Sequence, residues 1–294
     1  MDILGIPIQA FAAQLTVGLV NGSFYAMLSL GLAVIFGLLG VVNFAHGAMY
    51  MVGAFVTYAG AQWLGLNYWV SLLVAPLVVG ALGVAIEMSA LRRLYKLDPI
   101  YGLLLTFGLA LILEGLFFQQ FGSNGQQVSA PEALQGAIDL GFMVLPIYRL
   151  WVVAASLTVC LATWFLIERT SLGALLRAGT ENPRLVQAFG VNVPIMVTLT
   201  YAGGAALAGL AGVLAAPVIQ VEPEMGSKLI IVVFAVVVIG GMGSILGSIV
   251  TGLMVGLIQG LTRAFKPEAS EVIVFVLMAI VLVIRPAGLF GKEK

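Results

Sequence analysis

A polar, glycine-flanked segment interrupts the longest uncharged stretch of this sequence and limits what the chain can fold into. Residues Phe11 to Leu66 contain no formally charged side chain, yet Gly40-Val41-Val42-Asn43-Phe44-Ala45-His46-Gly47 breaks their apolar run. Unpaired backbone groups are costly in a bilayer, so such a break must face protein or water rather than lipid. Broken transmembrane helices are often where transporters place a substrate path. The pattern therefore indicates a helix that is interrupted within the membrane.

The composition supports a protein that is embedded in a bilayer over its whole length. Hydrophobic residues make up 61% of the chain and charged residues 9%, whereas soluble domains carry roughly 25% charged residues. Apolar runs of about 20 residues recur, which is typical of transmembrane helices. We expect an all-α, polytopic membrane protein with about eight, and up to ten, transmembrane segments that include broken or re-entrant helices. Residues 1–294 form a single transmembrane domain in this interpretation.

The apolar segments differ in length, and two of them need a special explanation. The first, from about residue 8 to 39, exceeds one perpendicular span, so a division near Asn21-Gly22-Ser23 is an option. Residues 229–239 reach only about 16 Å as a helix, half of a bilayer. We therefore expect a half-helix that is broken at Gly240-Gly241-Met242-Gly243-Ser244. This second break has the same pattern as the first, as an internal repeat would produce.

The distribution of basic residues predicts the orientation. The loops at 92–98 and 168–192 carry six of the thirteen Lys and Arg residues, and the loops at 122–141 and 221–226 carry none. Short basic loops mark the cytoplasmic side. We expect the first two loops and the C-terminal tail with Arg285, Lys292 and Lys294 to be cytoplasmic. The N-terminus lacks the basic region of a cleaved signal peptide.

Few residues in the apolar segments are suited to chemistry. His46, the only histidine, either is a hydrogen-bonded structural residue or lines the path, and Asn43 leaves the same two alternatives. Glu87 lies near Arg92 in the sequence, which favours an interfacial position, whereas Glu114 is deeper and either pairs with another helix or subunit or meets substrate. The predicted path residues are Asn43, Phe44, His46, Gly47, Glu114, Gly240, Gly241, Gly243 and Ser244.

The basic loop at about 169–192 is amphipathic but too polar to span a membrane. Pro183 after Asn182 suits the first turn of a short helix that Asn182 caps. We expect this helix to end at Gly190 and to present apolar side chains, either to a docking protein or to the lipid surface. The predicted coupling residues are Arg177, Ala178, Glu181, Asn182, Leu185, Ala188, Phe189 and Gly190.

Several classes of site are excluded by the motifs that are missing. No glycine-rich stretch ends in the Gly-Lys-Ser/Thr of a phosphate-binding loop, and no H-E-x-x-H or G-x-S-x-G motif occurs. The single cysteine, Cys160, excludes a disulfide framework and a thiolate cluster. We expect no catalytic residue, no metal site and no cofactor in this chain. If transport is driven by ATP, another subunit must bind it.

Several motifs resemble one family of transport proteins over the whole chain. They are the Val42-Asn43-Phe44-Ala45-His46-Gly47 block, the Gly173-x3-Arg177-Ala178-x3-Asn182-x5-Ala188-x-Gly190 loop, the small-residue run 205–212, the 240–244 break and the closing Arg285-Pro286-x-Gly288-Leu289-Phe290-Gly291. Together they resemble the permease subunits of bacterial branched-chain amino acid ABC importers, the LivH type. The first block is the most specific of these motifs.

The resemblance implies a multi-pass subunit of the bacterial cytoplasmic membrane that moves leucine, isoleucine and valine. It also implies three kinds of partner: a second related permease, two cytoplasmic ATPases that bind ATP and Mg, and an extracytoplasmic substrate-binding protein. No nucleic-acid partner is expected. Related systems carry urea, short amides or aromatic acids, so these remain alternative substrates. An ion-coupled secondary carrier is a further alternative, which needs a deep carboxylate pair, and only Glu114 qualifies for one.

Overall fold

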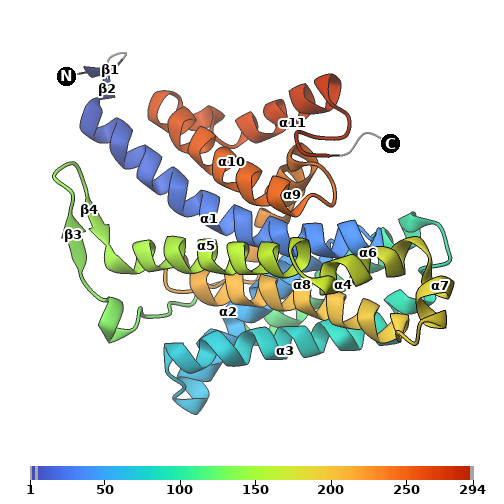
Figure 1. The fold of residues 1–294 in the computed structure, drawn as a ribbon. Helices are drawn as coiled ribbons and strands as arrows, with labels where there is room; N and C mark the ends of the chain where they lie inside the picture. Colours follow the sequence, from blue (N-terminus) through green and yellow to red (C-terminus); the bar gives the residue numbers. More distant parts are fainter. Residues whose placement is uncertain (1, 4–5, 292–294) are drawn as a thin grey trace.

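A computed structural model describes residues 2–3 and 6–291, and within them the fold is almost entirely helical (Figure 1). Lys292 and Lys294 of the predicted cytoplasmic tail lie outside the described residues. The α-helices are α1 (Ile8–Leu39), α2 (Ala45–Leu64), α3 (Tyr68–Ser89), α4 (Pro99–Phe121), α5 (Ile147–Glu168), α6 (Ser171–Glu181), α7 (Pro183–Ala188), α8 (Val193–Ala215), α9 (Met225–Gly240), α10 (Ile245–Phe265) and α11 (Val272–Ile284).

The few remaining elements are short and lie between the helices or before them. Two antiparallel pairs of strands occur, β1 (Asp2–Ile3) with β2 (Ile6–Pro7) and β3 (Ala137–Asp139) with β4 (Val144–Pro146). Single 3-10 turns cover Leu91–Arg93, Glu132–Leu134 and Pro267–Ala269. The β3–β4 hairpin folds the polar stretch after α4 back to the start of α5, which the sequence did not predict.

The helices confirm the prediction of a polytopic all-α membrane protein. Six of them, α1, α3, α4, α5, α8 and α10, are long and apolar enough to cross a bilayer, and α9 and α11 are shorter apolar helices. The 20 residues of α2 extend about 30 Å, which is also the thickness of the hydrocarbon core.

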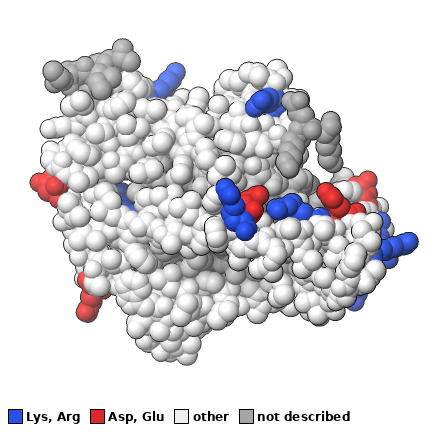
Figure 2. All heavy atoms as spheres, viewed as in Figure 1, with Lys and Arg blue, Asp and Glu red and all other residues white. Residues whose placement is uncertain are grey.

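The two ends of the molecule differ in their charge. In Figure 1 the β3–β4 hairpin lies at one end of the long helices, and α6 and α7 lie at the other. Figure 2 shows Lys and Arg side chains gathered toward the α6–α7 end, where acidic side chains lie among them, further acidic side chains at the opposite edge, and a mostly white surface between the two ends. A membrane protein needs such an uncharged band between its two charged ends, because the band contacts the hydrocarbon core of the bilayer.

Helix α1 is continuous, so the division considered near Asn21-Gly22-Ser23 is wrong. The Ser23 hydroxyl donates a hydrogen bond to the Val20 carbonyl within the same helix, at 2.7 Å. Gly22 lies against α10, where an added Cβ would stand 3.0 Å from the Leu253 carbonyl oxygen. These small and polar residues therefore serve close helix packing, which small side chains permit in a membrane.

The expected break after residue 239 is confirmed, but the helix before it is longer than predicted. Helix α9 begins at Met225 and has 16 residues, about 24 Å at 1.5 Å per residue, still short of a 30 Å core. It ends at Gly240, and α10 begins at Ile245 after a turn in which Gly241 and Gly243 have φ of 100° and 87°. Only glycine adopts such angles readily.

Candidate functional site

The first break lies between α1 and α2, and its start is a glycine in the left-handed region. Gly40 has φ of 67° and donates its N–H to the Phe36 carbonyl at 2.8 Å, which ends α1. The chain is then non-helical until α2 starts at Ala45. The sequence therefore located this break correctly.

Helix α4 satisfies the backbone of the break through one threonine. The Phe44 N–H donates to Thr106 Oγ1 at 3.1 Å. The Thr106 hydroxyl has the carbonyls of Val42 and Leu103 as acceptors at 3.2 and 3.0 Å. Freed backbone groups at membrane depth need such partners. The sequence analysis did not identify Thr106. The only indication in the sequence was a hydroxyl side chain within an otherwise apolar segment.

His46 is buried and holds the start of α2 against α1. It is 0% exposed, and its Nε2 lies 3.0 Å from the Leu28 carbonyl oxygen. A carbonyl accepts only, so Nε2 carries the proton in this bond. Leu28 lies about 16 Å along α1 from its last residue, so the break returns the chain into the bilayer rather than running along its surface.

Asn43 is also buried but has no hydrogen-bond partner for its side chain. It is 1% exposed, and neither amide atom is bonded to any described residue. The Tyr201 hydroxyl is likewise buried and lies next to the Asn43 side chain, without a well-formed hydrogen bond between them. Buried polar atoms of this kind usually bind water or a ligand.

Phe44 and Glu114 are brought together by the fold. Both border a cavity of about 180 Å³ between α2, α4 and α9. The Phe44 ring stacks on Phe234, with ring centres 5.9 Å apart, and meets Phe107 edge-on at 6.2 Å. Gly47, one turn further on, allows α2 to touch α9, because a Cβ there would stand 2.5 Å from the Gly226 carbonyl oxygen.

The second break lies elsewhere, at the end of the molecule that carries α6. The Ser244 hydroxyl accepts a hydrogen bond from the Gly247 N–H and caps α10. Gly243 and Ser244 border a cavity of about 790 Å³ that Glu168 and Arg177 also line. Gly240, Gly241, Gly243 and Ser244 thus do not share the cavity of Phe44 and Glu114.

The C-terminal segment covers this second break. The N–H groups of Leu289 and Phe290 donate to the carbonyls of Ile239 and Gly240 at 2.8 and 3.0 Å. These carbonyls would otherwise be unpaired at the end of α9. The Arg285–Gly291 motif in the sequence therefore has a structural role at this break.

The predicted coupling residues form an exposed surface on α6, α7 and the residues that follow. Asn182 caps α7 as predicted, since its Oδ1 accepts from the Leu185 N–H at 3.1 Å. Leu185 and Phe189 are 54% and 80% exposed, whereas Val186 is buried, so the apolar side chains of α7 face two ways. The other predicted residues, Arg177, Ala178, Glu181, Asn182, Ala188 and Gly190, are all exposed. Helix α7 ends at Ala188, two residues before the expected Gly190, which has φ of 85°.

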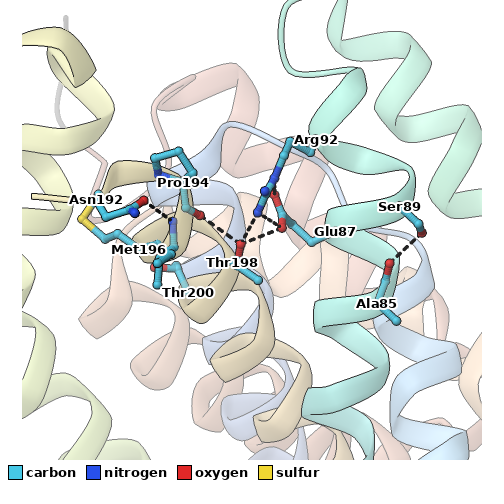
Figure 3. A network of polar contacts seen from close by, with 10 residues as sticks. Ala85, Glu87, Ser89, Arg92, Asn192, Pro194, Met196, Thr198 and Thr200 are labelled. Carbon is cyan, nitrogen blue, oxygen red and sulfur yellow. Dashed lines mark hydrogen bonds and ion pairs between the residues drawn. The ribbon is translucent and has the colours of Figure 1, made fainter. Parts of the chain in front are cut away.

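A buried carboxylate fixes α8 to α3 at the same end of the molecule (Figure 3). Glu87 is 0% exposed and accepts from Arg92 Nε and Nη2 at 3.2 and 2.9 Å. Thr198 of α8 lies 2.8 Å from the same carboxylate. The sequence placed Glu87 near the interface because Arg92 follows it; the structure pairs it with that arginine and buries it fully. Such a pair, fully hydrogen-bonded, is structural rather than available to a solute.

The described residues contain no group of three or more His, Cys, Asp or Glu side chains that could hold a metal ion. The site is instead a set of helix breaks, cavities and an exposed loop, which suits movement rather than bond chemistry.

Comparisons with known proteins agree with this arrangement. The sequence matches the family described as "Branched-chain amino acid transport system / permease component" over residues 14–282. The permease protein LivH of the high-affinity branched-chain amino acid transport system of Salmonella typhimurium is 30% identical over 97% of this chain and 96% of its own. BraD of Pseudomonas aeruginosa is 28% identical over 98% of both chains. LivM of Escherichia coli is 29% identical over 92% of this chain and 68% of its own. No solved structure matches the chain. The chain therefore belongs to the family of permease components of branched-chain amino acid transport systems.

Proposed function

We propose that this chain is the membrane-spanning permease of an ATP-driven importer that moves branched-chain amino acids into the cell. The family and the printed names of LivH and BraD support this substrate. The chain itself performs no bond chemistry, and ATP and Mg belong to two partner ATPases at the α6–α7 end. An extracytoplasmic binding protein delivers the substrate at the opposite end.

The second permease of the pair is a related chain in this proposal. LivH and LivM are both named as permease proteins of one kind of transport system, and this chain is similar to both. The match to LivH covers nearly all of both chains, whereas LivM is longer than the region matched. A heterodimer of a LivH-like and a LivM-like chain is thus the proposed membrane unit.

The observation that carries the proposal is the exposed apolar pair on the coupling surface. Phe189 is 80% exposed and Leu185 54%, on a segment too polar to cross a membrane. Large apolar side chains in such a position are typical of a protein-docking helix. The surface is connected to the membrane helices, because Arg177 lies 3.7 Å from Glu168 and 3.4 Å from the Ile167 carbonyl oxygen at the end of α5.

These contacts give a route from ATP hydrolysis to transport. ATPases that close around Leu185 and Phe189 would displace α7 and the adjoining α6. Because Gly179 of α6 packs tightly against the Met196 side chain of α8, this displacement would be transmitted to α8. Rigid displacement of packed helices can then change which end of a path is open.

We test the docking surface with the double variant Leu185→Glu/Phe189→Glu. Both positions are exposed, so the fold of the permease should persist, whereas two buried, unpaired carboxylates at an interface should cost several kcal/mol of binding. We expect the tagged variant to insert normally, to lose its co-purifying ATPases and to lose uptake in cells.

A matched control is Val144→Glu, which changes an equally exposed apolar residue (65%) at the other end of the molecule. It should retain the ATPases. If the double variant still co-purifies with ATPases and transports, the coupling surface is wrongly assigned. A wild-type chain that purifies alone and transports on its own would favour a secondary carrier instead.

A further inference from the structure

The cavity between α2, α4 and α9 is a cup with an aromatic base. Phe44, Phe107 and Phe234 form one cluster of rings, and two of these, Phe44 and Phe107, line the cavity. Phe44 is held by Thr106 of α4, so the cluster lies at the level of the first break. The rest of the cup extends from this level toward the end of α4 and the start of α9.

The walls of the cup are almost entirely apolar. Its volume of about 180 Å³ equals the share of about six water molecules in the liquid, which is enough for a branched side chain of four carbons. Pockets lined by hydrophobic side chains with one or two polar groups are typical of small-molecule sites. The apolar lining includes Met51, Ala110, Leu111, Ile230 and Ile231.

Glu114 is the only charged residue of this lining. It lies two turns of α4 beyond Phe107, about 10 Å further from the cluster of rings. Within residues 2–3 and 6–291 its carboxylate takes part in no ion pair and no side-chain hydrogen bond. A carboxylate at membrane depth is costly and usually has a cationic partner. The other carboxylate of the apolar helices, Glu87, has that partner in Arg92.

We propose that this cup binds the transported solute, with its ammonium group on Glu114 and its aliphatic side chain on the phenylalanine base. The inference rests on the proposed function, since it assigns the place where an α-amino acid would stop within the membrane. Two parts of the cup recognise two parts of the solute. The Glu114 carboxylate selects the ammonium group, and the apolar walls select an uncharged side chain of limited size.

The same geometry explains how the solute would leave. Phe44 and Phe107 lie at the side of the cup that faces the first break, and Phe44 belongs to that non-helical break rather than to a regular helix. A shift of the break relative to α4 would part Phe44 from Phe107 and open the base. Transport needs weak binding that can be released, and a single carboxylate in a small cup offers that.

The test uses the complete importer, with both permeases, both ATPases and the binding protein, in proteoliposomes. Glu114→Gln keeps the size of the side chain and removes its charge. We expect leucine uptake to fall about tenfold or more, while the complex assembles and the binding protein holds leucine as before. Glu132→Gln, a carboxylate outside the cup on the exposed loop, should transport normally.

A second variant tests the apolar part. Ala110→Leu adds three carbon atoms inside the cup, so the ratio of leucine uptake to valine uptake should fall about tenfold. Ala154→Leu adds the same atoms on the exposed side of α5 and should leave the ratio unchanged.

The outcomes separate this inference from the function on which it rests. Normal uptake of both amino acids by Glu114→Gln and Ala110→Leu overturns the site but not the function. If Glu114→Gln prevents assembly, the test rests on the ratio of leucine uptake to valine uptake by Ala110→Leu. An unchanged ratio overturns the site, and a lower ratio supports it. A wild-type importer that moves neither amino acid contradicts the function itself, and the site with it.

Discussion

At the scale of single residues, two polar side chains, Thr106 and His46, stabilise the first break through defined partners. Thr106 bonds the backbone on one side of the break, and His46 bonds Leu28 of α1 on the other. The motif around His46 was visible in the sequence, but its partner was not, because Leu28 lies in another helix. We propose the structural alternative for His46, since its side chain is fully buried, bonds Leu28 and lines neither of the two cavities described above.

We therefore expect His46→Gln to retain most transport and His46→Leu to lose stability. The glutamine amide reaches about as far as Nε2 and can donate to the Leu28 carbonyl, whereas leucine cannot. The loss of one buried hydrogen bond costs about 1 kcal/mol. Thermal unfolding of the purified permease pair measures the difference. Equal stability of the two variants, together with equal loss of uptake, would place His46 in the path.

At the scale of helices, glycine positions determine which pairs can approach closely. Helix α8 is the clearest case, because it packs against α1, α2 and α3 along most of its length. Gly209 and Gly212 contact α3 and α2, whereas Gly203 has no atom within 4 Å of the place where a Cβ would be. The small-residue run was visible in the sequence, but which of its members face a helix depends on the tertiary arrangement.

This contrast yields a matched pair of variants on one helix. In Gly212→Ala the new Cβ would stand 2.2 Å from the Tyr50 carbonyl oxygen, so α2 and α8 must separate, at a cost of about 1–3 kcal/mol. Gly203→Ala meets open space and should leave stability nearly unchanged. Fluorescence-detected thermal unfolding in detergent compares the two. A similar loss in both variants would show that the α2–α8 contact is not the cause.

The accuracy of the sequence predictions also varies by element. The start of a helix with a clear signal was predicted to the residue: α7 starts at Pro183 after the Asn182 cap. Hydropathy alone misjudged α1, because a glycine that serves helix packing looks the same in the sequence as one that ends a helix. It also missed the first turn of α9, where Ser227 and Lys228 interrupt the apolar pattern. The cup around Glu114 was unpredictable, since α2, α4 and α9 meet only in the folded chain.

At the scale of the whole molecule, the charge distribution and the direction of the helices agree. The described Lys and Arg residues at the α6–α7 end outnumber those at the other end, and the C-terminal segment lies with them, since Phe290 and Gly291 line the same cavity as Arg177. Positive residues remain in the cytoplasm during insertion. The α6–α7 surface and the C-terminus should therefore be cytoplasmic, and the β3–β4 hairpin extracytoplasmic.

Cysteine labelling tests this orientation directly, because Cys160 is the only cysteine of the chain and is buried in α5. In a Cys160→Ala background, Ser123→Cys places a thiol on the exposed loop after α4, and Thr180→Cys places one on α6. We expect a membrane-impermeant maleimide added to intact cells to label the first within minutes and the second only after the membrane is permeabilised. The unaltered chain should stay unlabelled in both conditions, since Cys160 is 0% exposed. The reverse pattern would put α6 and α7 outside the cell, where no ATPase could reach Phe189, and would refute the coupling mechanism whatever the substrate.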